Sequence, residues 1–333
     1  MHKKLLCLLV TAFLATALSA QTEPATSRAL SSHSESTNRS FEVMGKKIED
    51  VLWHFTVGDI ATVAKYRIAS SKPRRERSST AQGAGNPLIL PIYVFAPKEL
   101  RGKAPLIIYV HGGVHGDFAI SQTHIVRELI SEGYVVVAPE YRGSTGYGSD
   151  FYSQIDYGGA EVDDVKDARD WAVEMLPNVD AKRVGIIGWS HGGYQALLNI
   201  FQWPEAYQVA YAGVPVSDLV QRMGYKSQSY RDIFKEFIGK EAVDDPAEYR
   251  RRSPVVHAHK LATPLLIHTT TNDEDVNVME VEHLISALKA AGKKFEYKIY
   301  QNAPGSHQFN RIDTRLARES RREIYEFLRR HLK

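Results

Sequence analysis

The sequence predicts an α/β fold in which a mostly parallel central sheet carries helices on both faces. From about residue 98, short apolar runs alternate with amphipathic stretches of helical period. One of these runs turns into a helix at a serine flanked by glycines. The chain has 333 residues, of which 43% are hydrophobic and 24% charged, so it can build a large core. Strands that alternate with helices favour a parallel sheet covered on both sides.

Residues 1–20 have the pattern of a cleavable secretory signal. Lys3 and Lys4 precede an apolar stretch that runs to about Leu18 and ends in small residues. An uncleaved membrane anchor is the alternative, but the apolar run is near the lower limit for spanning a bilayer, so we expect no stable membrane insertion. The only cysteine, Cys7, would leave with the signal. The sequence therefore predicts a periplasmic or secreted protein without a thiol.

Residues 21–40 are rich in serine and threonine and poor in large apolar residues, which predicts a flexible leader. We expect the folded domain to span 41–333, with N-terminal strands in 41–97 and the catalytic core in 98–333. Three segments of the first part favour strands: VLWHFTV (51–57), ATVAKYRIAS (61–70) and LILPIYVFAP (88–97). A polar loop with glycine and proline separates the last two, as in a hairpin.

The core is expected to alternate strands and helices along the chain. Strands are expected at 105–113, 134–143, 183–189, 207–216, 263–269 and 295–300. Helices are expected at 124–133, 161–176, 192–201 and 277–292, and at the C-terminus. In the helix at 161–176, apolar residues recur at helical spacing and acidic residues fill the first turn, where the helix dipole favours them. Residues 214–253 interrupt the alternation of strands and helices with mixed helical segments. They are expected to form a cap or pocket wall.

The stretch VGIIGWSHGGYQALL (184–198) contains a Gly-x-Ser-x-Gly motif centred on Ser190. In a nucleophile elbow, a strand turns abruptly into a helix and holds the serine in a strained conformation at the turn. Glycines flank it because side chains there would strike the neighbouring strand or helix. A surface serine in a glycine-rich turn is the alternative, but it would not explain the change from strand to helix. Ser190 is the predicted nucleophile.

A serine hydroxyl needs a base, and the base needs an orienting acid. With a nucleophile elbow, the order along the chain is serine, then acid, then histidine. His307 follows the last strand in the loop NAPGSHQF and is the predicted base. The acid is expected in NDEDV, after the strand at 263–269, with Asp273 first and Asp275 second.

The tetrahedral intermediate of acyl transfer needs hydrogen-bond donors for its oxyanion. The backbone N–H of His191, directly after the nucleophile, is one predicted donor. The other should come from HGGVHG (111–116), where we select Gly113 because bare backbone can approach the substrate there. His111 is expected to be structural rather than a second base.

Charge and composition exclude several other classes of function. The formal net charge is +3, and since two lysines leave with the signal, the mature chain carries +1. This gives no electrostatic case for a nucleic-acid partner, and the basic clusters at 72–77 and 329–333 are expected to be solvated surface. The histidines lack paired ligand spacing and no phosphate-binding loop is present, so no metal and no cofactor is expected.

Taken together, the motifs resemble the catalytic domain of the prolyl oligopeptidase family of serine peptidases. The resemblance runs from about Leu88 to the C-terminus. It is carried by YVHGG, PEYRGSTGYGSDF, EVDDVKDARDWAV, VGIIGWSHGGYQALL, RRSPVVHAHKLATPLLIH, DEDVNVMEVEHLISALKAAGKKFEY and GSHQF. It implies an α/β-hydrolase fold with Ser190, Asp273 and His307 as the triad.

The sequence departs from that family's pattern in several places. Members usually place a β-propeller before this domain, and we expect none here because only about seventy residues separate the signal from the matched region. The resemblance therefore does not extend to dipeptide release, for which the family uses glutamates in the propeller. His191 stands where tyrosine is commonest, Val114 replaces the usual proline and Thr269 replaces a usual glycine. One extra residue lies before Asp273, and it keeps Asp275 open as the acid.

The sequence thus predicts a serine hydrolase that acts on a small peptide or ester substrate. A peptidase acting on short peptides is favoured by the resemblance. A carboxylesterase acting on small acyl esters is the alternative, favoured by an open site without a propeller. A non-catalytic scaffold or binding protein is a further alternative, against which the complete set of triad residues argues.

Overall fold

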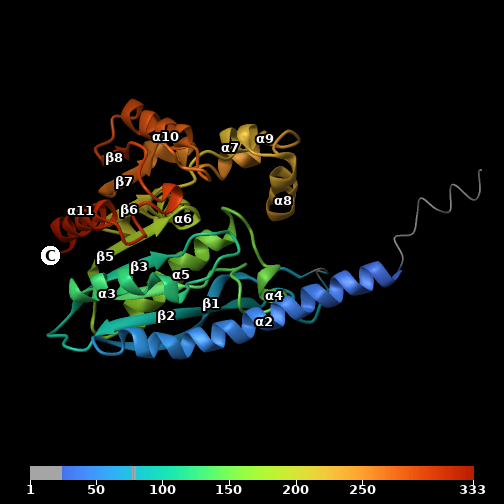
Figure 1. Cartoon of the computed structure of the whole chain (residues 1–333), viewed down its shortest axis with the longest axis horizontal. Helices are drawn as coiled ribbons and strands as arrows, with labels where there is room; N and C mark the ends of the chain where they lie inside the picture. Colours follow the sequence, from blue (N-terminus) through green and yellow to red (C-terminus); the bar gives the residue numbers. More distant parts are fainter. Residues whose placement is uncertain (1–24, 77, 79) are drawn as a thin grey trace, which may run out of the picture.

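The computed structural model describes residues 25–333 except 77 and 79, and gives only the backbone for residues 25–32 (Figure 1). The expected signal at 1–20 lies outside the described residues. Eight strands form one sheet in the order β1-β2-β4-β3-β5-β6-β7-β8. The strands are β1 (Ala61–Pro73), β2 (Pro87–Pro97), β3 (Ala104–Val110), β4 (Val135–Pro139), β5 (Val179–Trp189), β6 (Val209–Gly213), β7 (Leu265–Thr270) and β8 (Glu296–Tyr300). The pairs β1–β2 and β2–β4 are antiparallel, and all other pairs are parallel.

Helices cover both faces of this sheet, and each face has its own hydrophobic core. The longer helices are α2 (Ala25–Val57), α3 (Thr123–Ser131), α5 (Ala160–Met175), α6 (His191–Gln202), α10 (Val278–Ala290) and α11 (Arg315–Leu332). Side chains of α5, α6 and α10 pack in one core, and those of α2, α3 and α11 pack in the other. Because successive strand residues point to opposite faces, Ile108 joins the first core while Ile107 and Tyr109 join the second. The predicted α/β class is confirmed.

The expected elements from residue 98 onward are found close to their predicted positions. The hairpin is also confirmed, since β1 and β2 pair antiparallel across the polar loop. In the irregular region expected at 214–253, three short helices form: α7 (Leu219–Tyr225), α8 (Gln228–Ile238) and α9 (Pro246–Arg251). Figure 1 shows α7, α8 and α9 grouped together, apart from the helices that cover the sheet.

The N-terminal region contradicts the sequence expectation. Residues 25–57 form one continuous helix, α2, so the flexible leader expected at 21–40 is wrong from residue 25 onward, as is the strand expected at 51–57. The polar side chains can be satisfied within a helix. The Thr37 hydroxyl donates to the carbonyl of His33, and the Ser40 hydroxyl donates to the carbonyl of Ser36, each four residues earlier. Order thus begins well before residue 41.

Tertiary packing explains why 51–57 is helical despite its β-branched and aromatic residues. Trp53 and Val57 are four residues apart, share one face of α2 and are fully buried. Trp53 stacks on Phe118 with ring centroids 5.5 Å apart and meets the edge of Phe95 at 4.9 Å. In a strand, Phe55 would share the buried face of Trp53 and Val57, but Phe55 is 79% exposed. The burial pattern therefore requires a helical period, and packing overrides the local strand preference.

A buried lysine links α2 to the loops that follow β3 and β4. Lys46 forms ion pairs with Asp117 at 2.5 Å and Glu140 at 2.8 Å, and donates to the carbonyl of Phe118 at 2.9 Å. Glu140 is fully buried and its other oxygen lies 3.3 Å from Nε2 of His111. Burial alone would raise the pKa of Glu140, but Lys46 and His111 outweigh it and hold this pKa at about 2.

Replacing Lys46 with methionine is expected to destabilise the protein by about 3–5 kcal/mol, because Glu140 would be left as an unpaired buried charge. The folded-state pKa of Glu140 lies below its ordinary value, so its contribution is present above about pH 4.5 and is lost as the pH falls toward about 2. Urea unfolding measured across this range should show a smaller acid loss in Lys46→Met than in the parent. The exposed neighbour Lys47 is the control, since Lys47→Met should change stability by less than about 0.5 kcal/mol. A loss below about 1 kcal/mol in Lys46→Met would refute the role of Lys46.

Candidate active site

The carboxyl ends of the parallel strands meet at one edge of the sheet, and the predicted site residues lie in the loops that follow them. Gly113 follows β3, Ser190 follows β5, Asp273 follows β7 and His307 follows β8. In the sheet order these strands stand within one parallel block. Loops at this edge of open α/β sheets are where ligands usually bind.

Ser190 occupies a sharp turn between β5 and α6. Its φ of 58° and ψ of −122° are unusual for a residue with a side chain, and such strain concentrates at functional sites. Its backbone is fixed because its N–H donates to Gly213 and its carbonyl accepts from Tyr194. A Cβ on Gly188 would lie 2.2 Å from the carbonyl oxygen of Gly192. The local geometry is that of the predicted nucleophile elbow.

His307 and Asp273 form the hydrogen-bonded pair that the sequence predicts. Nδ1 of His307 lies 2.8 and 2.9 Å from the two carboxylate oxygens of Asp273. The Asp273 side chain is fully buried, and it also accepts from the backbone N–H groups of Asp275 and Val276. These backbone donors fix the carboxylate before it meets the ring, so Asp273 can orient the imidazole through Nδ1 and leave Nε2 to act as a base.

Asp275, the second possible acid, lies on the other side of the ring. Its nearest oxygen is 3.8 Å from Nε2 of His307, and its carboxylate is held at 2.9 Å by both Arg222 and Lys226. Burial opposes ionisation of Asp275, but these two cations and His307 outweigh it and lower its pKa to about 2. The geometry therefore favours Asp273 over Asp275 as the partner of Nδ1.

The third contact of a triad, between Ser190 and His307, is not made. Both residues lie in the described part of the chain, and no hydrogen bond joins the Ser190 hydroxyl to the His307 ring. The two loops are nevertheless attached to each other, because Nε1 of Trp189 donates to Oδ1 of Asn310 at 2.9 Å inside the core. Catalytic hydrogen bonds are often long in a free enzyme and tighten when substrate binds, so the proposed chemistry requires the His307 ring to move toward Ser190.

The two predicted oxyanion donors belong to segments that adjoin Ser190. His191 is the first residue of α6, where backbone N–H groups have no acceptor within the helix. Gly113 has a φ of +74°, which L-residues with side chains rarely adopt, and its carbonyl is held by the hydroxyl of Tyr141 at 2.9 Å. A Cβ on the preceding Gly112 would approach Cβ of Ser190 to 3.5 Å. The loop after β3 thus lies directly against the elbow.

Several residues around the site were not singled out from the sequence. Buried Glu161 lies 3.1 Å from Nε2 of buried His191, which places a polar pair beneath the elbow. Tyr141 holds both His111 and Gly113. The stretches PEYRGSTGYGSDF and EVDDVKDARDWAV contain Tyr141 and Glu161, so a motif signal existed, but nothing in it assigned these roles. His111 is buried and bonds Ser144, as expected of a structural residue.

The cap, as we call the short helices α7, α8 and α9, contacts the loop after β3. Phe237 on α8 meets the edge of His115, in the loop after β3, with ring centroids 5.0 Å apart. His115 in turn stacks on Tyr152 at 3.6 Å, and the Arg39 guanidinium from α2 lies 3.5 Å above the Tyr152 ring. The cap, the loop and α2 are therefore connected through one continuous stack of side chains.

Two further features concern ligands and membranes. Among residues 25–333, apart from 77 and 79, no group of three or more histidine, cysteine, aspartate or glutamate side chains is arranged to hold a metal ion. Within the same described part of the chain, no helix combines the length and apolar character needed to cross a membrane.

Comparison with known proteins finds relatives that match more than half of the chain. A model of the prolyl oligopeptidase family matches residues 120–333. An uncharacterized peptidase, YuxL, of Bacillus subtilis is 31% identical over 224 residues, which are 66% of this chain and 33% of YuxL. The acylamino-acid-releasing enzyme of Arabidopsis thaliana is 32% identical over 246 residues, which are 70% of this chain and 31% of that enzyme. The chain therefore spans about a third of the length of these relatives.

Solved structures share the fold. The uncomplexed acylaminoacyl peptidase of Pyrococcus horikoshii superposes with a TM-score of 0.69 at 24% identity, covering 82% of this chain and 42% of that one. Dipeptidyl peptidase 4 of Porphyromonas gingivalis gives a TM-score of 0.64 at 22% identity, covering 82% and 36%. At these identities the likeness concerns the fold alone.

Proposed function

The chain belongs to the prolyl oligopeptidase family, and from this premise we propose that it is a serine hydrolase that cleaves peptide bonds of short peptides through an acyl-enzyme. The observation that carries the proposal is the buried Asp273 carboxylate bonded to Nδ1 of His307, on the same edge of the sheet as the strained Ser190. A surface serine in a turn would need neither the strained backbone nor the oriented imidazole.

The proposed reaction begins when the hydroxyl of Ser190 attacks the carbonyl carbon of the scissile bond and Nε2 of His307 takes its proton. Asp273 stabilises the imidazolium through Nδ1. In this proposal the N–H groups of His191 and Gly113 bind the oxyanion of the tetrahedral intermediate. When the C–N bond breaks, His307 returns the proton to the leaving amine and an ester to Ser190 remains. Water, deprotonated by His307, then attacks this ester and releases the acid.

Peptide bonds are proposed as the substrate because the relatives named above are peptidases. The alternative is a carboxylesterase that acts on small acyl esters. Esters react more readily than amides with an activated serine, so hydrolysis of an ester alone does not identify a peptidase. A peptidase is identified by its use of substrate residues beyond the scissile bond, since it uses their binding energy to accelerate the chemical step.

A panel of substrates separates these two activities. We expect kcat/KM for peptidyl anilides to rise by about tenfold or more from one residue to three, because the two added residues together supply about 1.4 kcal/mol of binding energy or more. Short-chain nitrophenyl esters of increasing acyl length provide the comparison. Turnover of the esters with no hydrolysis of any anilide would replace the peptidase proposal by the esterase.

We also propose that the protein acts in the periplasm or outside the cell, on the basis of the apolar segment that follows Lys3 and Lys4. N-terminal sequencing of protein from the periplasmic fraction of a bacterial host should find a first residue just after Ser19 or Ala20. Protein retained in the cytoplasm with an intact N-terminus would contradict this proposal.

A further inference from the structure

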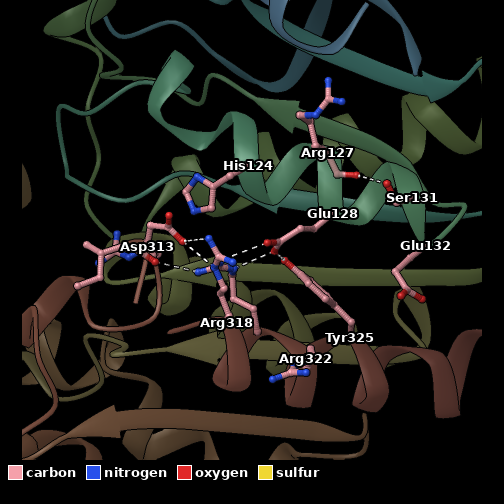
Figure 2. Close-up of a pocket in the computed structure, with 12 residues that line it drawn as sticks. His124, Arg127, Glu128, Ser131, Glu132, Asp313, Arg318, Arg322 and Tyr325 are labelled. Carbon is pink, nitrogen blue, oxygen red and sulfur yellow. Dashed lines mark hydrogen bonds and ion pairs between the residues drawn. The ribbon is translucent and has the colours of Figure 1, made fainter. Parts of the chain in front are cut away.

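A cavity of about 1040 Å³ lies between α3 and α11, on the sheet face that also carries α2 (Figure 2). We call it the arginine groove. Figure 2 shows Glu128 from α3 and Tyr325 from α11 reaching toward each other across it, and their side chains hydrogen-bond at 2.5 Å. Five guanidinium groups line its walls: Arg127, Arg311, Arg318, Arg321 and Arg322.

The acidic side chains of the groove are already neutralised. Arg321 meets both oxygens of Glu128, at 2.8 and 3.0 Å. Asp313 lies 2.6 Å from Arg318. Glu132, at the far end, pairs at 2.8 Å with Arg329, which lies outside the groove. Each of these three carboxylates is therefore already paired with an arginine, which weakens its repulsion of an incoming anion.

Two of the five arginines have no carboxylate of their own. Arg127 is paired with Asp59, outside the groove. Arg311 and Arg322, by contrast, make no ion pair within 4 Å anywhere in the described part of the chain. Arg322 is exposed, so water solvates its charge. Water does not solvate the Arg311 guanidinium in the same way, because its Nε is buried and has no hydrogen-bond partner among the described residues.

Arg311 therefore carries a charge that no direct ion pair compensates, although Asp273 and Asp275 attract it at longer range. Burial lowers its pKa, which means that the surroundings disfavour the cation. An anion placed against the guanidinium would supply the missing charge and the missing acceptors. His124, across the groove on α3, likewise has a buried Nε2 without a partner among the described residues. The groove thus presents two unsatisfied groups besides its excess positive charge.

The same arginine reaches the catalytic edge of the sheet. Nη2 of Arg311 donates to the carbonyl of His307 at 2.7 Å. A Cβ on Gly112 would lie 3.9 Å from Nη1 of Arg311 and 3.5 Å from Cβ of Ser190, so the guanidinium lies beside the elbow. A ligand held by Arg311 in the groove would therefore contact the loop that carries the proposed base.

We propose that the arginine groove binds the free carboxylate of a peptide, with Arg311 as its main partner and Arg322 adding charge to the wall. This inference rests on the proposed function, because a peptidase meets a carboxylate on each short substrate and makes a new one at each cleavage. A guanidinium matches a carboxylate with two parallel hydrogen bonds. The cavity has the volume for a peptide of a few residues.

Binding to the Ser190→Ala protein tests the proposal without turnover. Calorimetric titration with N-acetyl-alanyl-alanine should give an affinity at least tenfold higher than titration with its C-terminal amide. Adding Arg311→Gln should remove this preference, and adding Arg322→Ala should reduce it about threefold. Arg330→Ala is the matched control, because Arg330 lies on α11 outside the groove and pairs with Glu296. It should leave the preference unchanged.

Equal affinity for the acid and the amide would overturn the proposal. The proposal would also be overturned if the Arg322→Ala variant and the Arg311→Gln variant both kept the parent's preference for the acid over the amide. If Arg311→Gln fails to fold, Arg322→Ala decides, since Arg322 makes no ion pair within the described residues. Displacement of the acid by inorganic phosphate at equal concentration would assign the groove to phosphate and also overturn the proposal. Failure of the proposed function is seen separately, as absent hydrolysis of every peptidyl anilide by the unsubstituted protein.

Discussion

Ser190→Ala is expected to lower kcat for a peptidyl anilide by about 10⁵-fold or more. The alanine retains the strained turn and the two oxyanion donors, but no atom remains to form the acyl-enzyme. Triad members act as a unit, so the loss of the nucleophile removes the benefit of His307 and Asp273 as well. Initial rates in a purified preparation free of parent enzyme measure this effect.

Ser286→Ala is the matched control for this substitution. Ser286 lies on α10, is exposed, and donates only to the carbonyl of Glu282. Its replacement should leave kcat within about twofold of the parent and stability within about 0.5 kcal/mol. A Ser190→Ala protein that retains more than about 1% of parent activity would show that another nucleophile acts.

Asp273→Asn is expected to lower kcat by about 10³- to 10⁴-fold, whereas Asp275→Asn should lower it by less than tenfold. An asparagine at position 273 can donate to Nδ1 of His307, which would move the imidazole proton to Nε2 and block the base. Asp275 makes no contact with Nδ1 and is held by Arg222 and Lys226. The two variants have the same change in charge and volume, two residues apart, so each is the control for the other.

The reverse order of effects would identify Asp275 as the acid. That outcome would mean that the loop with the extra residue after His268 rearranges in the active enzyme. Steady-state kinetics on one anilide, with circular dichroism to verify folding, distinguishes the two results.

The core from residue 98 onward could be predicted because its signals are local. Each strand is a short apolar run and each helix an amphipathic one, and the change of period marks the boundaries. The elbow is local as well, because Gly188, Ser190 and Gly192 lie within five residues. The pair of Asp273 and His307 followed from chain order, since parallel strands bring their carboxyl ends to one edge.

The N-terminal helix could not be predicted because what stabilises it is distant in sequence. Lys46 pairs with Asp117 and Glu140, more than seventy positions away. Trp53 finds its aromatic neighbours on β2 and in the loop after β3. Local composition therefore indicated a polar leader and a strand, while burial of one helical face determined the result.

The choice between two acids was left open by the sequence for a related reason. Asp273 and Asp275 lie in one short loop, and the extra residue before them removes the family spacing as a guide. Only the backbone of that loop shows which carboxylate reaches Nδ1. Arg311 likewise gives no signal in the sequence, because the absence of a carboxylate partner is a property of the folded surroundings.

The proposed hydrolase activity requires Ser190 to be a reactive nucleophile, and active-site labelling tests this most directly. A fluorophosphonate should react with the folded protein in one-to-one stoichiometry, and mass spectrometry should find the adduct on the peptide that contains Ser190. The Ser190→Ala protein should remain unlabelled. Folded parent protein that takes up no label, or an adduct on a different residue, would contradict the role of Ser190 as the nucleophile.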